Sequence, residues 1–162
     1  MFITILQCIF YFFAWTFIIY WLHRIVHMFP KLAITHRGHH RFVAKNHITW
    51  HWNNIFLFND NWVSTIDYWI TEVIPTIIFV IITDQWWLGI GFYLYAAFIQ
   101  EWLEHNNTFN GYPFYTSGRW HLLHHTNYKC NYGIGTPFWD WVFGTNMKLN
   151  AESHKLKLEE TY

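Results

Sequence analysis

The stretch MFITILQCIFYFFAWTFIIYWLH at residues 1–23 decides how the chain is organised. It contains no Lys, Arg, Asp or Glu and is apolar over about 20 residues, the length that a helix needs to cross a hydrocarbon core of roughly 30 Å. It lacks the basic n-region and the small-residue cleavage site of a secretory signal peptide. We therefore expect residues 1–23 to be retained as a membrane-spanning helix.

Two further apolar stretches follow, VSTIDYWITEVIPTIIFVIIT at residues 63–83 and WWLGIGFYLYAAFIQEWL at residues 86–103. Only Asp84 and Gln85 separate them, which predicts a helical hairpin with a tight turn at the far face of the membrane. No stretch alternates polar and apolar residues as a half-buried strand would. The sequence therefore predicts an all-α integral membrane protein with about three transmembrane helices, built as a single domain over residues 1–162.

The first stretch of this hairpin carries two acidic side chains and a proline. Asp67 and Glu72 would be costly in a helix that faces lipid. We expect them either to face the protein interior or to lie in the interface region. Pro75 is expected to kink the helix, because proline removes a backbone hydrogen bond.

The cations predict the orientation of these spans. All ten Lys and Arg residues fall within residues 24–45 or 119–157, and none lies in the hairpin turn. Three crossings place both basic segments on one side of the membrane, and the positive-inside rule makes that side cytoplasmic. The histidines fall in the same segments or at the helix ends beside them. We therefore expect a helical cap that carries the histidines on the cytosolic face of the endoplasmic reticulum or of a bacterial inner membrane.

Composition excludes other classes of function. The 162 residues have a formal net charge of zero, so the chain lacks the basic footprint of a nucleic-acid-binding protein. Cys8 and Cys130 are the only cysteines, which favours neither a disulfide framework nor a thiolate metal site.

Histidines recur at helical spacings in short motifs. HRIVH occupies residues 23–27, HRGHH residues 36–40 and HLLHH residues 121–125, while His105 stands alone. On a helix, residues three or four apart share a face. A single histidine of this kind is usually a surface residue, but repeated imidazoles that were protonated would repel one another. A metal explains the clustering, because it binds neutral imidazole. Histidines in these motifs are therefore candidates for holding metal.

The number of ligands suits two metal ions, because one zinc ion takes four. A nitrogen-rich site with positions left open for dioxygen indicates non-haem iron. Two other classes stay open at this point. A non-catalytic metal-binding or metal-transport protein should line a path through the membrane with histidines, yet here they gather on one side. A zinc hydrolase of the membrane is a further alternative, although the sequence contains no HExxH motif.

The order of the motifs resembles the fatty acid hydroxylase / sterol desaturase superfamily of membrane di-iron oxygenases. YWLHRIVHMFPKLAITHRGHHR at residues 20–41 is similar to its first two histidine boxes, and FIQEWLEHNN at residues 98–107 to the segment with its isolated histidine. RWHLLHHTNYKCNYGIGTPFWDWVFGT at residues 119–145 is similar to its last box and the NYG, WD and FGT ending. The resemblance covers nearly the whole chain. Carried over by position, it implies nine catalytic, metal-binding histidines: His23, His27, His36, His39, His40, His105, His121, His124 and His125.

This resemblance implies a chemistry. It implies an enzyme that hydroxylates or desaturates an unactivated C–H bond of a lipid with dioxygen, two iron ions and external electrons. Zinc can substitute for iron in purified protein, because imidazole also suits zinc. The sequence shows no haem-binding domain, dinucleotide fingerprint or ferredoxin cysteines, so we expect a separate electron donor such as cytochrome b5 or ferredoxin with its reductase.

The chain departs from the family pattern at one position. Members similar to fatty acid 2-hydroxylases have a further histidine four residues after the isolated one, and here Phe109 stands in its place. A tenth ligand could come from His47, from His51, from Asn106 through a water, or from no residue.

Several residues are predicted to accept hydrogen bonds from the ligating histidines. Ligating histidines usually donate their second N–H to a carboxylate or a carbonyl. Glu101, one turn before His105, is one candidate acceptor. The others are Glu104, Asn131 and Asp140, of which Asp140 could instead anchor the C-terminal segment. His154 is expected to be solvated.

Overall fold

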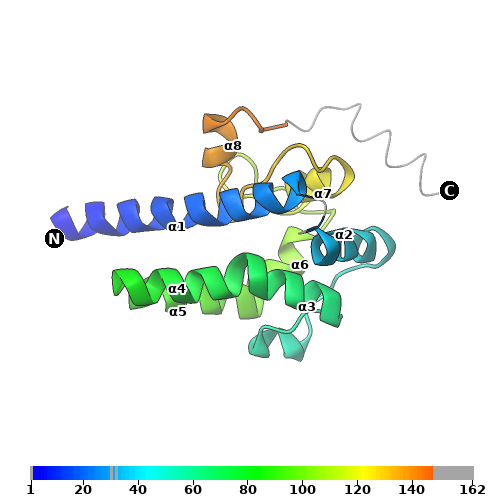
Figure 1. Cartoon of the computed structure of the whole chain (residues 1–162), viewed down its shortest axis with the longest axis horizontal. Coiled ribbons are helices and arrows are strands. Elements are labelled where there is room, and N and C mark those ends of the chain that lie inside the picture. Colours follow the sequence, from blue (N-terminus) through cyan, green and yellow to red (C-terminus); the bar gives the residue numbers. More distant parts are fainter. Residues whose placement is uncertain (1, 30, 32, 148–162) are drawn as a thin grey trace.

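A computed structural model describes residues 2–29, 31 and 33–147 of the chain (Figure 1). These residues form helices and connecting loops without any β-strand; a single β-bridge joins Asn110 and Gly118. The all-helical prediction is therefore confirmed for the described part. The prediction for His154 lies outside the described residues.

Helix α1, Phe2–Met28, contains the first predicted span. Its stretch Thr4–Met28 is long and apolar enough to cross a membrane. Ile5, Leu6 and Phe10 are exposed on its surface, as side chains that contact lipid are. The helix continues beyond residue 23, so that its last turns carry the first histidine pair.

The second predicted span is an uninterrupted run of three helical segments. It consists of α3 (Trp62–Tyr68), the π-helical turn η2 (Trp69–Val73) and α4 (Ile74–Thr83). Together they form the second helix that is long and apolar enough to cross a membrane, Trp62–Thr83. Asp67 and Glu72 are buried, so the first of the two predicted alternatives, an interior position, is confirmed.

The irregularity expected at Pro75 appears as the π-helical turn η2, which ends two residues before the proline. Proline has no N–H for the helix hydrogen bond to the carbonyl four residues earlier. A π turn is a common way of absorbing such a break, and it occurs frequently at functional sites. Here it accompanies the buried side chain of Glu72.

The third predicted span is helical from Trp86 to Glu104, through α5 (Trp86–Tyr95), the π-helical turn η3 (Ala96–Gln100) and α6 (Glu101–Glu104). Asp84 closes the turn before it with a left-handed backbone, φ 56°, a conformation that Asp tolerates better than most residues. Figure 1 shows α4 and α5 side by side, as the hairpin prediction requires.

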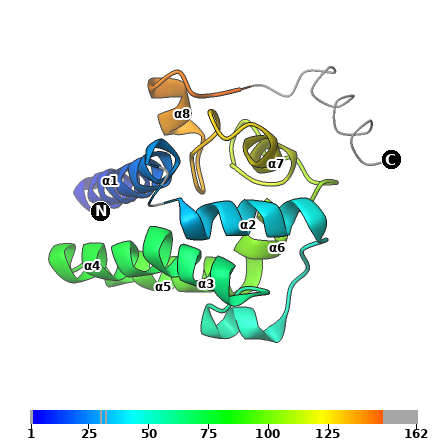
Figure 2. The same cartoon turned by 45° about the vertical axis from the view of Figure 1, so that its right-hand side comes forward.

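Short helices gather at one end of the long ones. They are α2 (Ile34–Lys45), the 3-10 helix η1 (Trp52–Phe56) and α7 (Arg119–Thr126). The short helix α8 (Phe138–Val142) packs instead against the middle of α1, where Trp139 contacts Phe13 and Phe17. Figure 2 shows α2 in the middle of this end, with α7 on one side and α3 on the other. The end of the bundle is therefore the place where histidines from distant parts of the sequence can meet.

Candidate metal centre

The nine predicted histidines come from four places in the fold and converge on one region. They lie in the last turns of α1, along α2, at the C-cap of α6 and along α7. Eight of them are on helices at spacings of three or four residues, and the bundle turns these faces toward one another. The rings form two neighbouring groups.

The first group holds five histidines: His23, His27, His36, His40 and His124. One nitrogen of each lies within 4.8 Å of one nitrogen of every other member. The Nε2 atom of His36 is central, at 2.8 Å from the Nε2 of His27 and 3.0 Å from that of His40. The Nε2 atoms of His27 and His124 are 3.1 Å apart. We call these five residues the first cluster.

The second group contains His39, His105 and His125, whose nitrogens lie within 4.8 Å of one another. His121 adjoins them, because its Nε2 is 3.0 Å from the Nε2 of His125. We call these four residues the second cluster. The two clusters touch where the rings of His40 and His125 stack, with centroids 4.2 Å apart.

Oxygen acceptors hold many of these rings from behind. The Nδ1 atoms of His23, His105 and His124 lie 2.7–2.8 Å from the backbone carbonyls of Tyr132, Glu101 and Cys130, respectively. A carbonyl oxygen only accepts hydrogen bonds, so each of these Nδ1 atoms carries the proton and donates. The Nε2 atom of such a neutral ring then has a free lone pair, and it points into the cluster.

His36 and His39 are held by side chains instead. The Nδ1 of His36 donates to the Asp67 carboxylate at 2.7 Å, and the Nδ1 of His39 lies 3.3 Å from the hydroxyl of Ser64. A carboxylate behind a histidine fixes the ring and raises its basicity as a ligand, and the combination is a recurring feature of metal sites.

Burial favours the neutral form of five cluster histidines on α2 and α7. Burial, together with the neighbouring rings, lowers the pKa of His40 to about 2. The same two causes lower the pKa values of His39, His121, His124 and His125 well below the usual value. Neutral imidazole is the form that binds metals.

The first cluster contains lone pairs that face each other. His23 and His36 both donate through Nδ1, yet their Nε2 atoms are 3.1 Å apart. When both rings are neutral, these two nitrogens are unprotonated, so they cannot hydrogen-bond to each other and their lone pairs repel. A cation between them removes the repulsion, so the donor set fits a metal ion. The second cluster fits one too, with buried imidazole nitrogens and an Nδ1 on His121 that has no partner in the described part.

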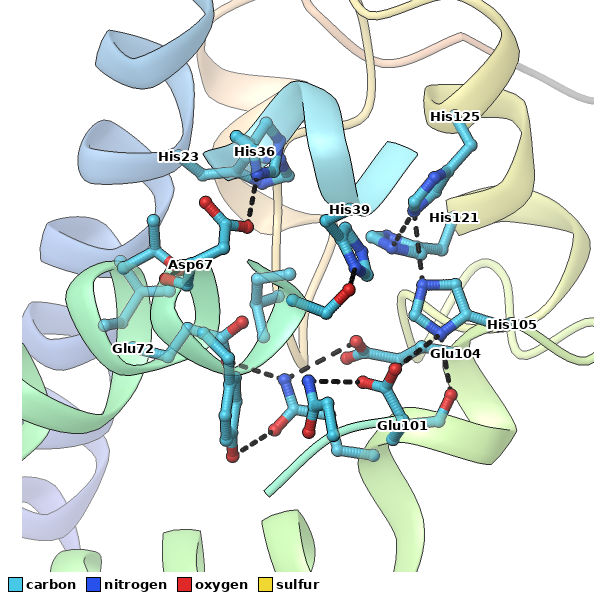
Figure 3. Close-up of a pocket in the computed structure, with 17 residues that line it drawn as sticks. His23, His36, His39, Asp67, Glu72, Glu101, Glu104, His105, His121 and His125 are labelled. Carbon is cyan, nitrogen blue, oxygen red and sulfur yellow. Dashed lines mark hydrogen bonds and ion pairs between the residues drawn. The ribbon is translucent and has the colours of Figure 1, made fainter. Parts of the chain in front are cut away.

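A polar pocket adjoins both clusters (Figure 3). Histidines line one side of it, and Figure 3 shows Glu72, Glu101 and Glu104 across from them. Asn59, Thr71 and Gln100 contribute further polar groups, while Ile19 and Ile134 are the only aliphatic residues in the lining. Reactants at the second cluster would thus meet a polar, buried surface.

Of the three acidic residues predicted to accept hydrogen bonds from ligating histidines, only Glu101 does so. Glu101 does hold His105, but through its backbone carbonyl; its carboxylate oxygen is 4.0 Å away. Glu104 accepts a hydrogen bond from Tyr95 instead of from a histidine. Asp140 accepts from the backbone N–H groups of Tyr132 and Gly133, which is the anchoring role that the sequence left open for it.

Asn131 likewise ties the C-terminal segment down, because its side chain accepts from the N–H of Met147 and donates to the carbonyl of Trp120. Asp67 was not predicted as an acceptor for His36. The sequence nevertheless marked Asp67 as a candidate, because an acidic residue inside an apolar span indicates a functional site.

The candidates for a tenth ligand lie elsewhere. His47 and His51 are exposed, and the Nε2 of His51 lies 3.3 Å from Asp60. Asn106 uses its side-chain oxygen to accept from the N–H and the hydroxyl of Thr108. Phe109 packs its ring against Tyr115. In the described part, therefore, none of these residues joins the second cluster.

Comparisons with known proteins agree with this arrangement. The family model for fatty acid hydroxylases matches residues 8–145. The chain is 27% identical over 157 residues to a very-long-chain aldehyde decarbonylase of Oryza sativa subsp. indica, covering 90% of this chain and 24% of the relative. It is 28% identical to a ceramide very long chain fatty acid hydroxylase of Schizosaccharomyces pombe, with coverages of 89% and 43%.

A third relative, methylsterol monooxygenase 1 of Rattus norvegicus, is 41% identical over 51 residues, or 32% of this chain and 17% of the relative. The chain thus spans less than half the length of each of these three proteins. No solved structure matches the chain at a significant level.

Proposed function

The chain belongs to the fatty acid hydroxylase family, and on that premise we propose that it is a membrane-bound di-iron oxygenase that hydroxylates or desaturates a lipid. Its relatives are named as oxidoreductases that act on sterols and ceramides. Lipids are therefore the class of substrate proposed here. The proposal treats residues 1–162 as one membrane domain.

The facing lone pairs of the first cluster carry this proposal. With both rings neutral and donating through Nδ1, the Nε2 atoms of His23 and His36 present two lone pairs 3.1 Å apart, which a bound metal ion would accept. The first cluster would hold one iron ion, and His39, His105, His121 and His125 would hold the second. Nitrogen ligands suit iron, and also zinc.

When bound, the iron pair supplies the redox chemistry that activates dioxygen. Hydroxylation then consumes one dioxygen, two electrons and two protons and releases one water; desaturation with the same inputs releases two. The chain holds the ligands in their metal-binding tautomer through the acceptors behind them. Burial of His39 and His124 keeps bulk water from the reacting region. The electrons would come from a separate donor such as cytochrome b5 or ferredoxin with its reductase.

The membrane orientation is a further part of the proposal. We infer three spans, with the hairpin turn at Asp84 on the non-cytoplasmic side and the histidine end in the cytoplasm. Single cysteines introduced at Asp84 and at Lys45, with Cys8 and Cys130 replaced, should be labelled from opposite sides of the membrane by an impermeant thiol reagent. Labelling of both positions from one side would contradict three spans.

The function is tested by metal analysis combined with lipid profiling. Protein purified gently from cells and reconstituted with iron should contain about two metal ions per chain. Cells that express it with a matching electron donor should accumulate a hydroxylated or newly unsaturated lipid. A content of two metals without any lipid product, under conditions in which a related oxygenase is active, would indicate a non-catalytic metal-binding protein instead.

A further inference from the structure

In the described part of the chain, most acidic side chains are buried, whereas the basic side chains lie at the surface. Asp67, Glu72, Glu101, Glu104 and Asp140 are buried, whereas only Asp60 and Asp84 are exposed acids. Every described Lys and Arg is exposed or half-buried. Carboxylates are almost never fully buried without a partner, so a group of buried acids requires an explanation.

Four of these five acids line the pocket beside the histidines: Asp67, Glu72, Glu101 and Glu104. No Lys or Arg in the described part forms an ion pair with any of them. The side chains that donate hydrogen bonds to the three glutamates are all neutral. Gln100 donates to Glu72 at 2.6 Å, Asn59 donates to Glu101 at 3.0 Å, and Tyr95 donates to Glu104 at 2.6 Å.

The proposed metal site has the opposite problem, because its positive charge would lack a negative partner among the ligands. Nine neutral imidazoles bring no negative charge to two divalent ions, which leaves a formal charge of +4 in a buried region. The four carboxylates that line the pocket would carry −4 when all are ionised, as cations bound beside them would favour. Buried charges are costly unless they are paired, and their interaction is strong because the surroundings have a low dielectric constant.

We propose that the negative charges of Asp67, Glu72, Glu101 and Glu104 balance the positive charge of the metal pair. Glu72 and Glu104 would act through their charge alone, without contacting a metal ion. Asp67 reaches a ligand directly through His36. Glu72 contacts no histidine and is linked to Glu104 through the amide of Gln100, which lies 2.6 Å from the first carboxylate and 3.5 Å from the second. The inference rests on the proposed metal pair and explains why a lipid-metabolising membrane protein buries so many acids.

Glu72 gives the sharpest test, because glutamine preserves its shape and its hydrogen bond while removing its charge. The Oε1 of the new side chain can still accept from Gln100. Full-length wild type, Glu72→Gln and Asp84→Asn would be stripped with a chelator and titrated with Zn²⁺ alone in detergent. Asp84→Asn removes the same charge from an exposed turn and serves as the matched control.

Glu72→Gln is expected to weaken Zn²⁺ binding about 10-fold, because a negative charge is removed from surroundings of low dielectric constant near the metals. Asp84→Asn should bind as the wild type does. The metal-free Glu72→Gln protein should melt no lower than the metal-free wild type, because glutamine keeps the shape of the side chain and replaces a buried carboxyl group that lacks its cation. Opposite effects on metal affinity and on metal-free stability are the signature of a charge role.

Three outcomes would overturn the inference. Wild-type affinity in Glu72→Gln would show that the charge is irrelevant. Weaker binding together with a lower melting temperature of the metal-free variant would show a packing role instead. A wild type that binds no metal would overturn the proposed function as well, so the two failures are distinguishable.

Discussion

Replacing His124 by alanine is expected to abolish lipid oxygenation, with a loss of at least about 100-fold, and to lower the metal content from about two ions per chain toward one. His124 is completely buried, donates to the Cys130 carbonyl through Nδ1 at 2.7 Å and points its Nε2 at that of His27. Changes behind the ligands already cost about 10- to 100-fold in metal affinity or activity. Loss of a ligand should cost more.

The control for this experiment is His51→Ala. His51 is exposed and belongs to neither cluster, so activity and metal content should both stay near the wild-type values. The substitution of His124 also leaves the Cys130 carbonyl without its donor, which costs about 1–3 kcal/mol of stability. Metal content should therefore be measured on the folded, monodisperse fraction. Full activity in His124→Ala would refute the ligand assignment.

The spacing of the histidines predicted that they share helix faces, but it did not predict how they divide. In HRGHH, His36 and His40 enter the first cluster, while His39 enters the second. In HLLHH the division is reversed, because His121 and His125 lie in the second cluster and His124 in the first. In both motifs the pair four residues apart stays together, and the ring between them points to the other cluster.

This division depends on packing that no local pattern contains. Residues three and four apart both lie near one helix face, so either set could have faced a given metal. The choice is made by the approach of α3 to α2, which brings Asp67 behind His36 and Ser64 behind His39. The apolar spans, by contrast, follow from local composition and length, and the helices could be placed from the sequence within a few residues.

The grouping of the buried acids also depends on contacts between distant helices, which the local sequence does not predict. The sequence showed that Asp67 and Glu72 were too costly for a lipid-facing position, which was sufficient to predict an interior location. It did not show that α6 brings Glu101 and Glu104 to the same pocket. That meeting requires the antiparallel hairpin of α4 and α5 and the two π-helical turns, η2 and η3, which lie beside these residues.

Removal of the metals is expected to lower the melting temperature substantially. In the metal-free protein with both rings neutral, the Nε2 lone pairs of His23 and His36 face each other at 3.1 Å, and neither ring can rotate without losing its Nδ1 hydrogen bond. Bound metal removes this repulsion and also stabilises the fold by mass action. An ion present at a thousandfold excess over its Kd contributes about 4 kcal/mol, and for a chain of this size about 10 °C in melting temperature.

The measurement is thermal unfolding in detergent before and after chelation, followed by addition of Zn²⁺ or Fe²⁺. Two ions should raise the melting temperature in two steps if the clusters fill one after the other, since each cluster draws its ligands from different helices. The first cluster joins α1, α2 and α7, whereas the second joins α2, α7 and the end of α6. In His124→Ala, the step that belongs to the first cluster should disappear while the other remains. A melting temperature that does not respond to chelation would contradict a metal pair at this end of the bundle, because ions bound there would connect α1, α2, α6 and α7.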